Sequence, residues 1–207
     1  LNDFKKEVDE LIEKGLKKDE AIFNVLREYI KETKNILFEG DGYSKEWEIE
    51  AEKRGLSNHK TTPAALKAKV SQKSFDLFAE VGVMNHTEVE SRYEIELEEY
   101  IKKIQIESRV LGDIVRNHII PTAFKYQNVL IENVKGLKEI FGDEYTLYAD
   151  EQIKILKKIS EHINQLNAKM HKMMDARKYA NGLDNVEDKA NAYCNEVIPF
   201  FDEIRYH

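Results

Sequence analysis

Residues 87–141 read TEVESRYEIELEEYIKKIQIESRVLGDIVRNHIIPTAFKYQNVLIENVKGLKEIF. Apolar side chains recur every three or four positions across this stretch, which is the spacing of one helix face. Thr87 and Glu90 have the spacing of a capping box, so we expect the helix to begin there. Proline removes a backbone donor and crowds the preceding turn, so we predict a kink just before Pro121 and a helix that continues beyond it.

The same spacing recurs on both sides of this long helix. It predicts further helices over about 1–14, 19–33, 44–54, 63–81, 150–180 and 184–207, with a possible short strand at 36–38. Short loops between long helices favour antiparallel neighbours. The predicted fold is therefore all-α: an antiparallel bundle of long helices, one of them kinked at Pro121, with a smaller N-terminal group of short helices.

The pattern also predicts where the chain divides. The helices become long after about residue 86, so we expect a short-helix segment over 1–85 and a long-helix bundle over 86–207. The sequence starts at Leu1 and stops at His207, each within an amphipathic pattern. We therefore expect a piece of a longer polypeptide, with the bundle truncated at its C-terminus.

Composition excludes some classes of function. The formal charge is −7 and lysines are interleaved with glutamates, which argues against nucleic-acid binding. No apolar run approaches the length of a membrane span, so we expect no membrane partner. A single cysteine, Cys194, cannot form an internal disulfide, which favours a cytoplasmic location.

Residues that carry chemistry are scarce. None of the six histidines follows a glutamate by three positions, so the di-iron motif of helical bundles is absent. One cysteine rules out a multi-thiolate zinc site. Met170, Met173 and Met174 are either core or an adaptable binding face. We predict no catalytic, cofactor-binding or metal-binding residues in this chain.

Several runs of residues resemble a known family. They are Phe38-Glu39-Gly40-Asp41-Gly42-Tyr43-Ser44 with Trp47, Ala51-Glu52-Lys53-Arg54-Gly55-Leu56, Thr61-Thr62-Pro63-Ala64-Ala65-Leu66, Arg92-Tyr93-Glu94, Ile119-Ile120-Pro121-Thr122-Ala123, and Met174-Asp175-Ala176-Arg177. Together they resemble the part of type III glutamine synthetases that follows the catalytic barrel. The resemblance covers nearly the whole chain.

The resemblance implies a parent enzyme, a glutamate–ammonia ligase that makes glutamine with ATP and Mg²⁺ or Mn²⁺. It also implies that the metal-binding, ammonium-binding and phosphate-binding residues lie upstream of Leu1, so residues 1–85 would continue from a catalytic domain. The fragment alone is therefore predicted to be inactive and to need no cofactor of its own.

The same resemblance implies a structural role in subunit assembly, packing on the catalytic domain, or regulation. The partners would be the chain's own catalytic domain and neighbouring subunits of a ring-shaped homo-oligomer. The structural or interface candidates are Phe38, Gly40, Gly42, Tyr43, Trp47 and Pro121. An alternative is an independent helical adaptor that binds a partner protein, which the long kinked helix and the methionines would suit.

Overall fold

A computed structural model describes the backbone of residues 1–207 and every side chain except that of Asn35. Within this described part the regular elements are all helical, so the predicted all-α fold is confirmed. The α-helices are α1 (Asn2–Glu13), α2 (Lys18–Glu32), α3 (Lys45–Lys53), α4 (Thr62–Lys67), α5 (Gln72–Glu80), α6 (His86–Ile114), α7 (Ile120–Phe141), α8 (Tyr145–Asn181), α9 (Val186–Ala192) and α10 (Pro199–Arg205). The segment 36–38 forms no strand.

The contacts divide the chain into two compact units, residues 1–59 and 60–207. Residues 60–85 therefore group with the long helices in this structure, because α4 and α5 pack on α6. The boundary between residues 85 and 86 stays a prediction for the full polypeptide.

The first unit starts with a helical hairpin. Gly15 has a φ of 97°, which only glycine adopts readily, and it ends α1 as the sequence predicts. Val8 on α1 and Val25 on α2 are buried between the two helices. The Phe4 and Tyr29 rings meet edge to face, with 5.8 Å between their centroids. These apolar contacts account for the packing of α1 on α2.

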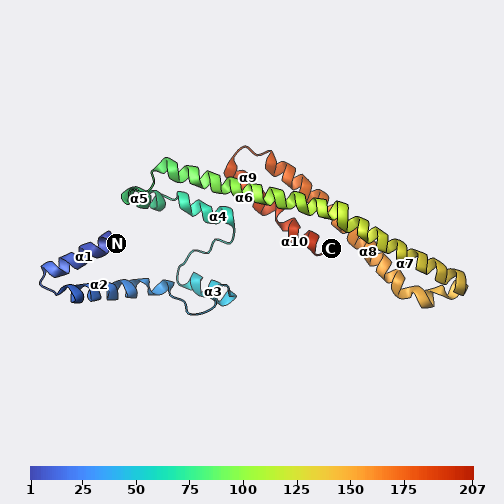
Figure 1. The fold of residues 1–207 in the computed structure, drawn as a ribbon, viewed down its shortest axis with the longest axis horizontal. Coiled ribbons are helices and arrows are strands. Elements are labelled where there is room, and N and C mark those ends of the chain that lie inside the picture. The colour runs from blue at the N-terminus through green and yellow to red at the C-terminus, as the bar shows by residue number, and fades with distance from the viewer. The chain divides into compact units, whose positions relative to one another are not determined.

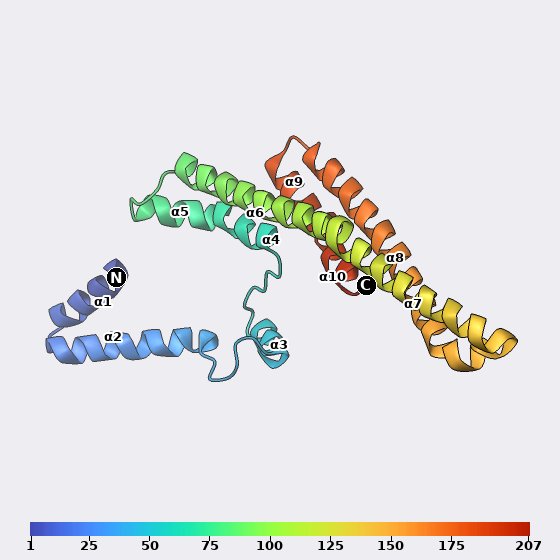
Figure 2. The ribbon, with the colours of Figure 1, turned by 45° about the vertical axis from the view of Figure 1, so that its right-hand side comes forward.

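The second unit is built on α6, α7 and α8. Figures 1 and 2 show α6 continuing into α7 and α8 returning beside it. The chain reverses at Gly142, whose φ is 57°. Near the start of α6, α4 and α9 cover it, and α10 packs on α8. The core there contains Tyr93, Leu97, Ile101, Ile104, Val115, Leu166, Met170, Met173, Ala180, Ala190, Ala192, Tyr193, Val197, Phe201 and Ile204.

The long helix bends through a π-helical turn, Val115–Ile119, that lies directly before Pro121. The Ile120 N–H donates to the Val115 carbonyl, five residues back, so one extra residue is accommodated. Proline cannot donate to the ladder, and the wider turn relieves its clash with the preceding backbone. The bend therefore lies where the sequence predicts it, and Pro121 explains it.

The last helix was predicted as continuous from Asp184 and is instead divided. A second π-helical turn, Tyr193–Val197, separates α9 from α10. It too precedes an Ile-Pro pair, and the Ile198 N–H donates to the Tyr193 carbonyl over 3.1 Å. Pro199 is therefore the residue in the sequence that indicates the break. It follows a π-helical turn, as Pro121 does after α6.

The predicted start of the long helix is also corrected. Asn85 caps α6, because its side chain accepts from the Glu88 N–H over 3.0 Å and the Glu88 carboxylate accepts from the Asn85 N–H over 2.8 Å. This capping box lies two residues before the predicted pair, Thr87 and Glu90. Both pairs have the same spacing, so the spacing alone cannot distinguish them.

Candidate functional site

A packed aromatic loop lies at the start of α3. The Phe38 ring stacks on the Trp47 ring, with 4.2 Å between centroids and 27° between planes. The Ser44 side chain accepts from the Trp47 N–H over 3.2 Å, so the cap of α3 fixes the position of Trp47. A Cβ atom at Gly40 would lie 2.5 Å from the Phe38 ring. A side chain at this position would therefore force the Phe38 ring to shift from its present stack.

Arg54 holds this loop on α3. Its guanidinium lies 5.7 Å from the centre of the Trp47 ring, and its Nη1 donates to the Leu37 carbonyl. Its Nε donates to the Glu50 carboxylate over 2.7 Å, and this hydrogen bond lowers the pKa of Glu50. In the sequence Arg54 stands out only as one residue of the run 51–56 that carries the family resemblance. Its role depends on contacts with the loop that helical spacing does not reveal.

The other two loop candidates face outward. Nothing lies within 4 Å of a Cβ placed on Gly42, and Tyr43 is fully exposed. Both line a shallow groove of about 330 Å³ that also includes Trp47 and Ala51. The structure thus brings five of the six candidates together in the first unit, whereas Pro121 belongs to the second. Their role as an interface stays a prediction.

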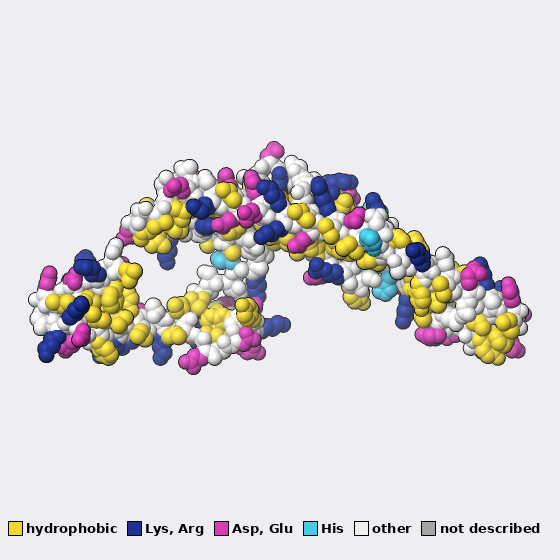
Figure 3. All heavy atoms as spheres, viewed as in Figure 1, with side chains coloured by type: hydrophobic (Ala, Val, Ile, Leu, Met, Phe, Trp, Pro, Cys, Tyr) yellow, Lys and Arg dark blue, Asp and Glu magenta, His cyan; other side chains and the backbone are white. Residues whose placement is uncertain are grey.

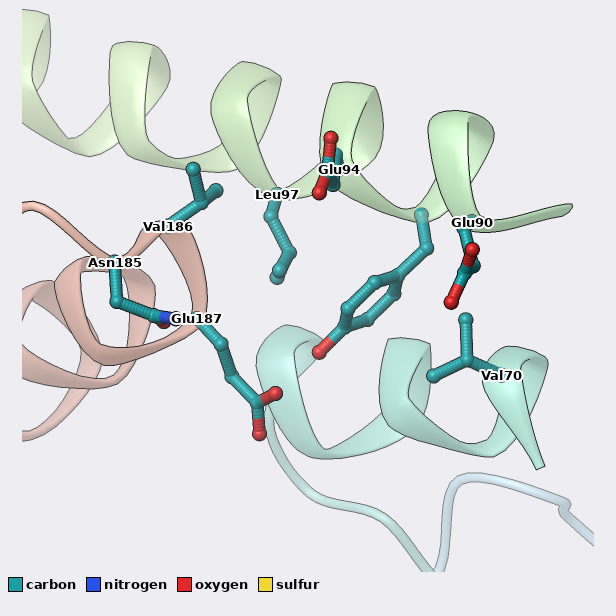
Figure 4. A pocket seen from close by; sticks show the side chains of 8 residues that line it. Val70, Glu90, Glu94, Leu97, Asn185, Val186 and Glu187 are labelled. Carbon is teal, nitrogen blue, oxygen red and sulfur yellow. The ribbon is translucent and has the colours of Figure 1, made fainter. Parts of the chain in front are cut away.

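A small acidic pocket lies between α6 and α9. Figure 4 shows Glu90 and Glu94 on α6, and Glu187 reaching across from α9. Lys67 pairs with Glu187, and this hydrogen bond lowers the pKa of the Glu187 carboxyl. The Tyr93 hydroxyl is buried here beside the Glu187 carboxylate. Burial, with a smaller contribution from Glu187, raises its pKa to about 12.

These carboxylates do not converge on a point. No group of three or more histidine, cysteine or acidic side chains in the described part of the chain could hold a metal ion. His162 and His207 do meet, with 2.9 Å between their Nδ1 atoms, but they form only a pair. The described residues thus contain no recognisable set for metal-assisted chemistry.

The sulfur-containing side chains have packing roles. Met170 and Met173 are buried in the core and Met174 is partly buried, which favours the core interpretation over an adaptable binding face for the first two. Cys194 is partly buried. It lies close enough to the Tyr100 hydroxyl to raise the pKa of Tyr100, although burial of the ring is the larger cause.

The hairpin of α7 and α8 carries the largest group of exposed apolar side chains in the second unit. Two helices alone cannot enclose both apolar stripes, and Leu130 and Ala149 are the buried residues between them near the turn. In Figure 3 yellow side chains gather at the far end of this hairpin. The exposed residues are Phe124, Tyr126, Val129, Ile131, Ile140, Phe141, Leu147 and Tyr148. We call this set the hairpin surface.

Polar contacts fix the register of the hairpin. Gln127 on α7 donates to the Ser160 hydroxyl on α8 over 2.8 Å, and Asn133 donates to Gln152 over 2.7 Å. Near the turn the Phe141 ring stacks on Tyr148, with 4.2 Å between centroids. The hairpin is thus held as a unit while its apolar surface stays uncovered. No described helix is both long and apolar enough to cross a membrane.

Fold and surface together define an all-helical region whose α7–α8 hairpin exposes several large apolar side chains. The sequence matches the family described as the glutamine synthetase C-terminal domain over residues 21–138. Because this match covers more than half of the chain, the chain belongs to the glutamine synthetase C-terminal domain family.

Three curated relatives agree with this assignment. A glutamine synthetase from Bacteroides fragilis (strain YCH46) is 45% identical over 100% of this chain and 28% of its own length. A glutamine synthetase from Butyrivibrio fibrisolvens is 32% identical over 90% of this chain, which corresponds to 26% of its own length. A type-3 glutamine synthetase from Dictyostelium discoideum is 30% identical over 89% of this chain, which corresponds to 25% of its own length.

The chain spans about a quarter of the length of these relatives. The resemblance to type III glutamine synthetases seen in the sequence is confirmed. The homologues are ligases by name, and this chain corresponds to a C-terminal portion of them.

Proposed function

We propose that this chain is the C-terminal helical region of a type III glutamine synthetase and that it serves assembly. In this proposal the hairpin surface docks on the catalytic domain or on a neighbouring subunit of the same oligomer. The aromatic loop around Phe38 and Trp47 provides a second contact. Regulation through either contact is compatible with the same architecture.

The observation that carries the proposal is the exposure of the hairpin surface. Ile140 is 74% exposed and Leu147 is 75% exposed, although both are large and apolar. Single exposed apolar residues are ordinary, but apolar residues gathered beside one turn, as Ile140, Phe141, Leu147 and Tyr148 are, mark an interaction site. The relatives are about four times as long as this chain, so a polypeptide of their length would itself offer a covering surface.

The parent's activity is part of the proposal. The whole polypeptide would join glutamate and ammonia to make glutamine, with ATP and a divalent metal ion. The described residues of this chain do not fit a divalent metal ion, because they contain no cluster of side chains able to hold one. The ATP and metal sites would therefore belong to the remainder of the polypeptide, and no catalytic step is assigned to this chain. A cytoplasmic location and a ring-shaped homo-oligomer belong to the same proposal.

The adaptor alternative has weaker support. The three relatives named above are all glutamine synthetases, and Met170 and Met173 are buried rather than available to a partner.

The test of assembly uses the full-length polypeptide and the double variant Ile140→Glu, Leu147→Glu. Both positions are exposed, so the fold should persist, whereas burying two carboxylates in an interface is strongly unfavourable. We expect smaller assemblies by light scattering after size exclusion, with unchanged helicity by circular dichroism.

The matched control is Lys157→Glu, an exposed position on α8 that changes the charge by the same two units. It should assemble as the unmodified polypeptide does. If the double variant has the same mass as the control, the hairpin surface is not an assembly contact. Glutamine formation by the full-length polypeptide, measured alongside, tests the parent activity separately.

A further inference from the structure

One side of α7 has no partner in the described part of the chain. The helix that packs along α7 is α8, and it covers Leu130. Beside that contact, residues recur on α7 at alternating intervals of four and three, which is the spacing of a coiled-coil seam. Tyr126, Val129 and Ile140 of this seam are exposed. We call the whole set the α7 seam: Thr122, Tyr126, Val129, Asn133, Gly136 and Ile140.

A groove runs beside the first half of the α7 seam. Thr122 and Tyr126 line it from α7, Ile159 lines it from α8, and its volume is about 570 Å³. Ile119 and Ala123 make most of the rest of its wall apolar. Two packed helices with an apolar groove along their junction accept a further helix, as in helical bundles. A helix is therefore the occupant that fits the α7 seam.

Gly136 is the one seam residue without a side chain. It lies inside α7 and has no positive φ, so the backbone does not need glycine there. Glycine destabilises a helix interior relative to alanine, because it loses more backbone entropy on folding. Nothing lies within 4 Å of a Cβ placed on Gly136, so packing within the described chain does not need glycine either. The free space suits a bulky side chain from another molecule.

We propose that the α7 seam pairs with α7 of a second copy of the chain, antiparallel and crossing at the level of residue 131. In this pair Tyr126 of each copy fills the space beside Gly136 of the other. The same residues make both halves of the contact, as two-fold symmetry requires. A parallel pair would set Gly136 against Gly136 and leave the space empty. The remaining layers pair Thr122 with Ile140 and Val129 with Asn133.

The charges beside the α7 seam favour the same pair. Lys125 and Glu139 each lie one residue before a seam position, where charged residues flank a coiled-coil contact. In the antiparallel pair Lys125 of each copy lies near Glu139 of the other, so opposite charges meet twice. Neither residue forms an ion pair in the described part of the chain, whereas Glu132, near the symmetry axis, is already paired with Lys135 over 2.8 Å.

The pairing rests on the proposed role in assembly and names the occupant of the α7 side of the hairpin surface. That occupant is the neighbouring subunit and not the catalytic domain. Charge complementarity and the match of Tyr126 with Gly136 both depend on two identical helices. The second copy is therefore favoured by residues of this chain alone.

The test treats the assembled full-length polypeptide with a carbodiimide, which joins an amine and a carboxylate in contact through an amide bond with loss of water. We expect mass spectrometry to find peptides in which Lys125 is linked to Glu139, in a product of twice the subunit mass. The two residues are about 21 Å apart on one helix, at about 1.5 Å per residue, so the link forms only between copies. Lys67 and Glu187, which pair within the chain, are the internal control for the reaction.

Charge reversal gives a second, independent measurement. Lys125→Glu alone and Glu139→Lys alone each set like charges against one another across the contact. We expect each single variant to dissociate, by light scattering on dilution, at about a tenfold or higher protein concentration than the unmodified polypeptide. The double variant Lys125→Glu, Glu139→Lys should assemble as the unmodified polypeptide does. Lys157→Glu, exposed on α8, is the matched control for the change of charge.

Three results would overturn the pairing. They are a link from Lys125 to any other segment in place of Glu139, no link from Lys125 while Lys67 and Glu187 are joined, and dissociation of the single variants at the concentration found for Lys157→Glu. A link from Lys125 to the catalytic domain would reject the second copy and leave the role in assembly standing. The role in assembly fails separately, if Ile140→Glu, Leu147→Glu leaves the assembled mass unchanged.

Discussion

Gly40 and Gly42 are two residues apart and have opposite surroundings. A methyl group at Gly40 would collide with the Phe38 ring at 2.5 Å, whereas one at Gly42 meets nothing within 4 Å. Neither glycine has a positive φ, so the difference is one of space alone. The sequence showed that both positions are glycine but not which of them packs against a ring.

We therefore expect Gly40→Ala to destabilise the first unit by about 1 kcal/mol or more, because the stack of Phe38 on Trp47 must shift. Gly42→Ala should be neutral. Trp47 is the single tryptophan, so its fluorescence during chemical unfolding reports on this unit directly. Equal losses of stability in Gly40→Ala and Gly42→Ala would show that the contact of Gly40 with the Phe38 ring does not limit the substitution.

Tyr93 allows a prediction on pH. Its folded-state pKa is about 12 against an ordinary 10.0. Between these values the folded chain holds a proton that the unfolded chain releases, so stability falls as the pH rises above 10. Tyr93→Phe removes this contribution to stability, which is worth about 3 kcal/mol at most because each pKa unit corresponds to about 1.4 kcal/mol.

The Tyr93→Phe variant should therefore be as stable as the unmodified chain at neutral pH and lose stability less steeply above pH 10. Chemical unfolding followed by circular dichroism at several pH values measures both. An identical alkaline slope in the variant would contradict the assignment to Tyr93.

At the scale of the element, the π-helical turn changes which side chain reaches the core. With a regular helix Ile119 would follow Val115 on the buried face, four residues on. The extra residue places Ile120 there instead, and Ile119 is 44% exposed. The turn therefore determines which face of α7 continues the buried face of α6. Apolar spacing alone did not decide whether Ile119 or Ile120 faces the core, because both are isoleucine.

Pro121→Ala should straighten the long helix and exchange Ile119 for Ile120 at the core, without abolishing the fold. Restoring an N–H removes the reason for the wider turn. Distances between spin labels on α6 and α7 would detect the change. A bend that persists would show that burial of Ile120, rather than proline, maintains the turn.

At the scale of the whole molecule, helix positions followed from local spacing, while contacts between helices did not. Apolar positions three and four apart located α6 and α7 closely, whereas α8 begins at Tyr145, about five residues before the predicted start at 150. The packing of α4 on α6 depends on tertiary contacts that no local pattern records.

Leu77 illustrates the same limit. It is apolar and lies on an amphipathic helix, yet it is 54% exposed, because the short α5 has few neighbours to cover it. An apolar stripe predicts a face that needs a partner. It does not identify whether that partner lies in the same chain.

The most direct test is the structure of the assembled full-length polypeptide by cryo-electron microscopy, with the exposure of Ile140 and Leu147 as the quantity measured. We predict that both side chains are buried against the catalytic domain or a neighbouring subunit. If both remain as exposed in the assembly as they are here, the hairpin surface is not a docking site and the proposed role in assembly is wrong.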